Sequence, residues 1–159
     1  MKKLLFTLVV VAATAVNAQC PTVESIVRGK EKSKDNYNVS AQSRTASILP
    51  GKEYEMSFIA QPGMDYRLAA KLAPGGTGTI TYEVYELTIE KKTEGGKTVY
   101  DRKKHVLATS GDAQSGALEF STDKARKIFV SVSLSGGDKK NPECVGVMIE
   151  DKKSTKIGF

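Results

Sequence analysis

Apolar residues recur at every second position along most of the chain after residue 43, and this two-residue period decides what the chain can fold into. The clearest case is KIFVSVSL, in which Ile128, Val130, Val132 and Leu134 alternate with other residues. Successive side chains of a strand point to opposite faces of a sheet, so the alternation predicts strands with one buried face. No long stretch has the three-to-four-residue period of a helix. We therefore predict an all-β fold.

Further runs with this period, separated by turn residues, bring the expected number of strands to about eight. These runs are EYEMSFIA, DYRLAAKL, ITYEVYELTIEKK, TVYDRKKHVLATS, ALEFS and CVGVMIED. EYEMSFIA and DYRLAAKL, joined by QPGM, are predicted to form a hairpin, and a short strand is expected at 22–27. About eight short strands with regular turn signals indicate a single antiparallel β-sandwich or jelly roll.

Two of these runs carry extra information. In ITYEVYELTIEKK the apolar parity changes between Val84 and Tyr85, which predicts a β-bulge that returns both apolar sets to one face, or a bend into a second sheet. Glu94-Gly95-Gly96-Lys97 is expected to turn the chain into the following strand. In CVGVMIED both faces carry apolar or small residues, so this last strand is predicted to be central.

The first eighteen residues, MKKLLFTLVVVAATAVNA, have the composition of a secretory signal peptide. Their apolar stretch is shorter than the roughly 20 residues of a membrane helix, so we predict no transmembrane span. Removal of residues 1–18 from the 159-residue chain leaves 19–159, the size of one domain, in which 19–44 is a polar segment. The predicted location is therefore periplasmic or secreted.

An exported chain with two cysteines has one internal pairing, Cys20 with Cys144. A disulfide that closes so long a loop is expected to stabilise the fold by roughly 4 to 5 kcal/mol in the chain-entropy model. A lipoprotein signal is the alternative, in which Cys20 is acylated and anchors the protein to a membrane, although the bulky Gln19 before it disfavours this reading. Two unpaired thiols are a further alternative.

The residues that carry most enzyme chemistry are few. The single histidine, His105, lies among basic neighbours, and no sequence signature links it to either cysteine. One histidine and two distant cysteines predict no zinc site, and the glycine-rich 75–78 lacks the lysine of a phosphate-binding loop. We therefore predict no catalytic residue, no metal and no cofactor. An envelope enzyme whose carboxylates converge only in three dimensions is the alternative.

The chain is mildly basic, with a net charge of +6 that falls to +4 when the two lysines of the leader are removed. This excess is too small to indicate nucleic acid as a partner. The doublets Lys91-Lys92 and Lys103-Lys104 lie on the two halves of the predicted Gly95-Gly96 hairpin and are candidates for a weak polyanion-binding patch. Lysines that protect strand edges and maintain solubility are the alternative.

Aromatic residues offer a second kind of binding surface. The apolar pattern does not fix the positions of three tyrosines, Tyr37, Tyr85 and Tyr100, so they are candidates for exposed rings that contact a glycan. Tyr54, Tyr66 and Tyr82 fit the apolar face instead and are predicted to lie in the core.

The segment ILPGKEYEMSFIAQPGMDYRLAAKL resembles the first half of the pre-peptidase C-terminal type of bacterial secreted β-sandwich, and KIFVSVSLSG resembles that family's near-terminal strand. The chain is also similar to small exported proteins of Gram-negative bacteria. The resemblance implies an exported, non-catalytic accessory domain. We therefore expect a binding protein of the bacterial periplasm or cell exterior whose partner is a protein or glycan of the envelope. An envelope-associated structural protein or lipoprotein is the alternative.

Overall fold

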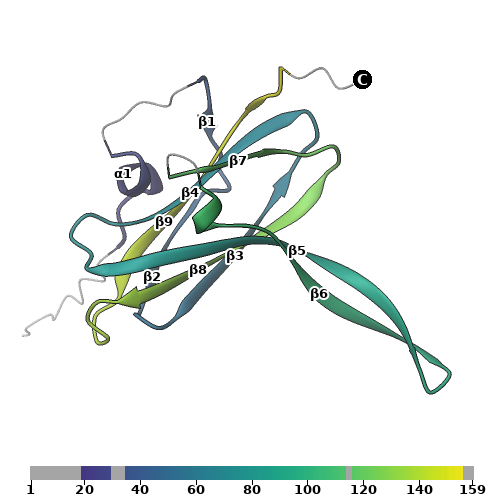
Figure 1. Ribbon diagram of the computed structural model, residues 1–159. Helices are drawn as coiled ribbons and strands as arrows, with labels where there is room; N and C mark the ends of the chain where they lie inside the picture. Colours follow the sequence, from purple (N-terminus) through teal and green to yellow (C-terminus); the bar gives the residue numbers. More distant parts are fainter. Residues whose placement is uncertain (1–18, 30–34, 114–115, 156–159) are drawn as a thin grey trace, which may run out of the picture.

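The computed structural model describes residues 19–29, 35–113 and 116–155. Within these residues nearly all regular structure is β, arranged as two antiparallel sheets that pack face to face (Figure 1). The prediction of an all-β sandwich is therefore confirmed, with nine strands in place of about eight. The predicted signal peptide, 1–18, lies outside the described residues.

The two sheets draw their strands from distant parts of the chain. The five-stranded sheet contains β1, β2, β4, β7 and β9, and the four-stranded sheet has the order β3-β8-β5-β6. The elements are α1 (Val23–Val27), β1 (Asn38–Val39), β2 (Arg44–Ile48), β3 (Glu53–Ala60), β4 (Met64–Leu72), β5 (Gly78–Glu94), β6 (Lys97–Thr109), the short 3₁₀ helix η1 (Ser110–Asp112), β7 (Leu118–Ser121), β8 (Arg126–Gly136) and β9 (Glu143–Lys153).

The core lies between the sheets and is filled by alternate residues of each strand. In the four-stranded sheet, β8 contributes the predicted row Ile128, Val130, Val132 and Leu134, all almost fully buried. The inner faces of β3, β4, β5 and β9 complete the cluster. Burial of a large aliphatic or aromatic side chain stabilises the fold by about 1.5–3 kcal/mol, so this layer is the main source of stability.

The predicted hairpin of EYEMSFIA and DYRLAAKL is wrong, although both strands exist. β3 pairs with β8 in one sheet, whereas β4 pairs with β7 and β9 in the other. The turn between them therefore connects the two sheets, and the Tyr66 hydroxyl accepts a hydrogen bond from the Gln61 amide there (2.7 Å). Each strand has one apolar face in either arrangement, so the alternation alone does not distinguish a hairpin from a crossing between sheets.

β9 is central, as predicted, because β1 and β2 pair on one side of it and β4 on the other. Val145, Val147 and Ile149 face the core, and the opposite face of the strand is covered by α1. A Cβ atom placed on Gly146 would lie 3.1 Å from the side chains of Ile26 and Val27. The helix therefore needs glycine at this position to approach the sheet so closely.

The segment 22–27 is a helix, so the strand predicted there is wrong. Thr22 accepts a hydrogen bond from the Ser25 amide through its side chain, which is the contact that begins a helix. Ile26 and Val27 then both turn toward β9 and are buried. Adjacent residues of a strand point to opposite faces, so only a helical turn lets these two side chains pack on one surface.

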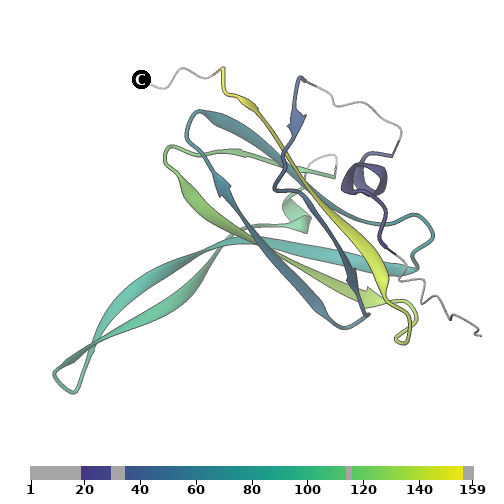
Figure 2. The ribbon, with the colours of Figure 1, turned by 180° about the vertical axis from the view of Figure 1, so that it is seen from behind.

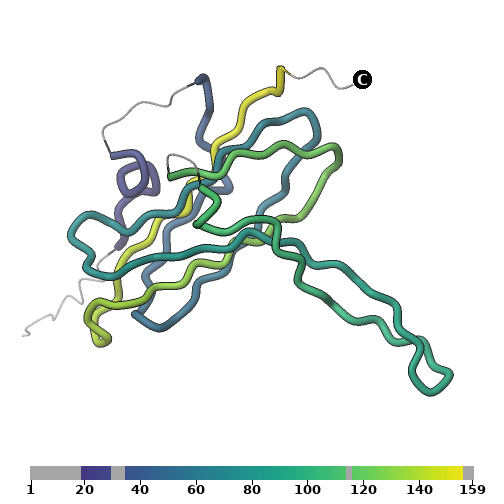
Figure 3. Tube along the Cα trace, in the orientation of Figure 1, coloured from purple at the N-terminus to yellow at the C-terminus, as the bar shows by residue number. Residues whose placement is uncertain are grey.

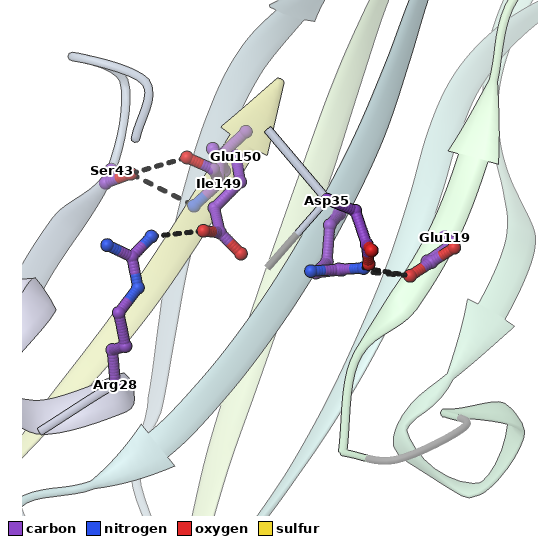
Figure 4. Close-up of polar contacts among 7 residues, drawn as sticks. Arg28, Asp35, Ser43, Glu119, Ile149 and Glu150 are labelled. Carbon is purple, nitrogen blue, oxygen red and sulfur yellow. Dashed lines mark hydrogen bonds and ion pairs between the residues drawn. The ribbon is translucent and has the colours of Figure 1, made fainter. Parts of the chain in front are cut away.

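Covalent and polar contacts hold this N-terminal segment on the five-stranded sheet. Cys20 and Cys144 form the predicted disulfide, with Cα atoms 5.5 Å apart and a sequence separation of 124. Arg28, at the end of α1, forms an ion pair with the buried carboxylate of Glu150 (Figure 4). Because β9 carries both partners of these contacts, the N-terminus is fixed to the middle of the sheet.

Candidate binding surface

β5 and β6 continue far beyond the sandwich as a two-stranded hairpin (Figures 1 and 3), and Figure 2 shows the same extension from behind. β5 pairs with β8 only as far as Tyr85, and from Glu86 to Glu94 it pairs with β6 alone. We call residues 86–94 and 97–105 the ribbon. Nine residues in a strand span roughly 30 Å, a distance comparable to the diameter of a small domain.

The ribbon begins at a bulge, which confirms the predicted irregularity near Val84 and Tyr85. Val84 is opposite Ala108 and Tyr85 is opposite Val106, so the extra residue is Leu107 in β6. Because β5 itself has no extra residue, its alternation continues unbroken. The expectation that both apolar sets share one face is therefore wrong: Val84 points into the core, whereas the second set points to the outer face of the sheet.

One face of the ribbon combines apolar and basic side chains. Directly opposed residues share a face, and the opposed pairs here are Leu87 with Lys104, Ile89 with Arg102 and Lys91 with Tyr100. We call these six residues, with Val106 at the base, the apolar–basic face. The exposed fractions of its apolar members are 41% for Leu87, 69% for Ile89, 68% for Tyr100 and 45% for Val106.

The other face of the ribbon, which we call the ion-pair face, holds paired charges. Its residues are Glu86, Thr88, Glu90, Lys92, Glu94, Lys97, Val99, Asp101, Lys103 and His105. Lys92 lies 3.0 Å from Asp101, and Lys103 lies 3.1 Å from Glu90. The hydrogen bond from Lys92 lowers the pKa of the Asp101 carboxyl. Exposed pairs of this kind stabilise a sheet only slightly, but their pattern favours the observed register.

The predicted patch of four lysines is divided between these two faces. Lys91 and Lys104 lie on the apolar–basic face, whereas Lys92 and Lys103 point the other way into ion pairs with carboxylates. The alternation of side chains already implies this division, because adjacent lysines of a doublet necessarily point to opposite sides of a strand. Because Lys104 is itself paired with Glu83, Lys91 alone of the four predicted lysines forms no ion pair within the described part of the chain.

The apolar–basic face continues onto the sandwich through Tyr85. This ring stacks on Phe129 with centroids 5.3 Å apart, and the ammonium of Lys104 lies 4.3 Å from its centroid. The Tyr85 hydroxyl donates to Glu55. Burial, followed by this hydrogen bond and the nearby carboxylates, raises the pKa of Tyr85 to about 12. The base of the face is thus a fixed, packed contact.

The three tyrosines that were candidates for exposed rings have different environments. Tyr85 is buried as described, and Tyr37 is also buried, with the cations of Arg67 and Lys152 4.3 and 4.2 Å from its ring centroid. Arg67 also forms an ion pair with Glu119, at 2.7 Å. Tyr100 alone among the three is exposed. The predicted core tyrosines Tyr66 and Tyr82 are buried, and Tyr54 packs partly exposed against the core.

Carboxylates on the outer face of the four-stranded sheet are each bound by a neighbouring side chain. Glu53 accepts from Ser131, Glu55 accepts from Tyr85, and Glu83 binds Lys104 at 2.6 Å. His105 is exposed on the ribbon, 3.8 Å from Glu86. In the described part of the chain, no group of three or more histidine, cysteine, aspartate or glutamate residues is placed to hold a metal ion.

A cavity of about 330 Å³ opens beside the bulge. Its wall is mostly apolar and includes Val84, Leu107, Leu118 and Phe120, and the polar side chain of Arg126 also lines it. The Nε atom of Arg126 is buried without a hydrogen-bond partner, but its guanidinium is paired with Asp123 and Glu86. The charge of this arginine is therefore already neutralised within the fold.

No family model matches the sequence, and no curated protein matches it. The resemblance to pre-peptidase C-terminal domains therefore stays a prediction. Over residues 19–29, 35–113 and 116–155, the structure contains no helix of the length and apolar character required to cross a bilayer. The predicted Gly95-Gly96 hairpin is confirmed, but sequence reasoning missed that its far part, the ribbon, extends beyond the sandwich. The signal for this was strand length, because β5 has 17 residues, about three times the usual five to six.

Proposed function

We propose that the protein is an exported, non-catalytic binding protein of the bacterial periplasm or cell exterior, and that the ribbon attaches it to the cell envelope. The observation that carries this proposal is the apolar–basic face. Ile89 and Tyr100 are about two-thirds exposed at the far part of an extension that contributes nothing to the core. Exposed apolar groups gathered on one surface are the usual mark of an interaction site.

The disulfide supports the exported location, because such bonds persist in oxidising compartments. It also bears on the lipoprotein alternative. Acylation uses the same Cys20 sulfur that the disulfide occupies, so one molecule has one or the other. The role as an accessory domain, which the family resemblance implies, is compatible with attachment through the ribbon and is part of the same proposal.

Expression of the full chain, with its own leader, in a Gram-negative host tests this function. We expect the intact mass of the mature protein to correspond to 19–159 less two hydrogens, with the protein recovered in the envelope fraction. Ile89→Ser is expected to release it. Val99→Ser is the matched control, because Val99 is 43% exposed on the ion-pair face of the same ribbon.

Two results would overturn the proposal. One is retention of the intact, reduced chain in the cytosol, which contradicts export. The other is equal envelope binding by the wild type and Ile89→Ser, which would show that the ribbon is not the attachment surface. Release of the Ile89→Ser protein together with retention of Val99→Ser supports it.

A further inference from the structure

Two of the three cations of the apolar–basic face, Lys91 and Arg102, lack carboxylates of the kind that pair with the lysines of the ion-pair face. All four acidic residues of the ribbon, Glu86, Glu90, Glu94 and Asp101, lie on the ion-pair face. Lys104 is paired with Glu83 at the base, but neither Lys91 nor Arg102 forms an ion pair with any residue in the described part of the chain. The face therefore presents positive charge interleaved with exposed apolar side chains.

We propose that the apolar–basic face of the ribbon, with Lys91 and Arg102 set between Ile89 and Tyr100, binds the surface of an anionic lipid bilayer. This inference rests on the proposed attachment through the ribbon and names what it attaches to. Lipid phosphates offer negative charge beside the edge of the acyl layer, so one surface satisfies both kinds of side chain. Tyrosine is favoured at that depth because its ring is apolar and its hydroxyl is polar.

The backbone fixes how the ribbon meets the lipid. A two-stranded ribbon has two open edges, and their unpaired N–H and C=O groups are costly to remove from water. The ribbon therefore lies along the interface, with its apolar–basic face toward the lipid and its edges hydrated, and does not cross the bilayer. The ion-pair face then points to solvent, in agreement with its ten mostly polar residues.

A second copy of the chain fits this face poorly. Two apolar–basic faces brought together would place Lys91 and Arg102 of both copies in one contact with no carboxylate from either ribbon. An antiparallel pairing of two β6 edges centred on Lys103 would oppose Arg102 and Lys104 of the two copies. Like charges directly opposite each other destabilise a sheet.

The other occupants also match less well. The ribbon is roughly 30 Å long and about 10 Å wide, so its face covers on the order of 300 Å² against the roughly 800 Å² per partner of a standard protein interface. A soluble polyanion would engage Lys91 and Arg102 but would leave the exposed Ile89 and Tyr100 without contacts. A lipid surface is deformable and closes around a narrow element.

Co-sedimentation of the mature, disulfide-bonded protein with vesicles tests the inference. Vesicles of phosphatidylcholine containing phosphatidylglycerol are compared with vesicles of phosphatidylcholine alone. We expect binding only to the anionic vesicles, and weaker binding as salt rises from about 0.1 M to about 1 M, because the Debye length shortens from about 10 to about 3 Å.

Four variants separate the two faces of the ribbon. Ile89→Ser is expected to lower the partition coefficient about tenfold or more, since it removes a large apolar side chain from the contact. Arg102→Gln is expected to lower it about fivefold. Their controls are Val99→Ser and Lys103→Gln, which make the same change of polarity or charge on the ion-pair face and are expected to leave binding unchanged.

The chain contains no tryptophan, so a single one serves as a reporter. Tyr100→Trp is expected to show a blue-shifted emission on addition of anionic vesicles, whereas Val99→Trp is expected to show none. This readout detects the orientation of the ribbon directly and does not depend on the strength of binding.

Each contrary result is specific. No binding to phosphatidylglycerol vesicles at low salt, or equal binding to neutral vesicles, overturns the lipid inference. Equal losses in the variants of both faces overturn the proposed orientation. Binding to inorganic polyphosphate that Ile89→Ser leaves unchanged, without binding to vesicles, identifies a polyanion site instead. Envelope membranes that retain the protein through Ile89 while pure vesicles do not would refute the lipid partner and leave the proposed function in place.

Discussion

Removal of the Cys20–Cys144 disulfide by the double substitution Cys20→Ser and Cys144→Ser is expected to destabilise the protein strongly. The bond joins residues that are 124 apart, so it closes almost the whole described chain into one loop. In the chain-entropy model, a loop of this size removes about 16 cal/mol/K from the unfolded state, which corresponds to about 4.9 kcal/mol at 25 °C. This is a large part of the 5–15 kcal/mol that typically separates folded and unfolded domains.

The expected change in melting temperature follows from the size of the mature chain. An unfolding entropy of about 2.1 cal/mol/K per residue gives about 0.3 kcal/mol/K for a domain of this length. A loss of about 4.9 kcal/mol therefore lowers Tm by about 16 °C. The full effect requires that the N-terminal segment stays docked without the bond, and the structure gives it other anchors: Ile26 and Val27 packed against Gly146, and the Arg28–Glu150 ion pair.

Thermal unfolding followed by circular dichroism measures this change, and amide hydrogen exchange over 23–27 reports whether α1 remains docked. The control is addition of a reductant, which is expected to lower the Tm of the wild type and to leave the double variant unchanged. A decrease of less than about 3 °C, equivalent to about 1 kcal/mol, with α1 still protected, would refute the reasoning. A small decrease with α1 unprotected would show that the bond holds only the helix.

Two further predictions concern the packing of α1 and the outer face of the four-stranded sheet. Gly146→Ala and Gly146→Val are expected to destabilise the protein progressively, by about 1–3 kcal/mol for valine, because their side chains meet Ile26 and Val27. Urea unfolding measures this loss of stability. Gly111→Ala is the control, because its added Cβ atom has an ordinary 3.5 Å contact. The pKa of Tyr85 is about 12 in the folded protein and near 10 in the unfolded chain, so the free energy of unfolding is expected to fall as the pH rises between these values. Tyr85→Phe is expected to make this fall less steep. Parallel pH profiles for the wild type and Tyr85→Phe would contradict the raised pKa of Tyr85.

The strands were predictable because side chains alternate between the two faces in every β-strand, whichever sheet it belongs to. β8 and β9 are the best cases. What the period does not contain is the partner of each strand. β3 and β4 read as a hairpin because only three residues separate them, yet their pairing with β8 and β9 depends on contacts 66 or more residues away. The alternation fixes which residues share a face, and the global topology decides which sheet receives the strand.

The same limit explains the two local errors. α1 has five residues, which is too short for a helical period to be visible, and its buried face depends on Gly146 more than a hundred residues later. The parity change at Val84 and Tyr85 correctly located a bulge, but the sequence of β5 does not show that the extra residue belongs to β6. The register of the partner strand has to be known before each apolar set of β5 can be assigned to a face of the sheet.

The candidate surface was the least predictable part of the structure. Alternation shows which side chains share a face, but it does not show whether that face is buried. Leu87 and Ile89 have the same pattern as core residues, but β8 stops pairing at Tyr85, and beyond it β5 pairs only with β6 within the described residues, so these positions lie outside the sandwich. The exposed part of each apolar side chain there stays in water in both the folded and the unfolded chain, so it contributes little to the stability of the fold. Polar substitution at Ile89 therefore removes no core contact, and the folded protein is expected to keep its stability while it loses its partner. Because such a variant is expected to stay folded, its loss of attachment would report the loss of the binding surface and not unfolding of the protein.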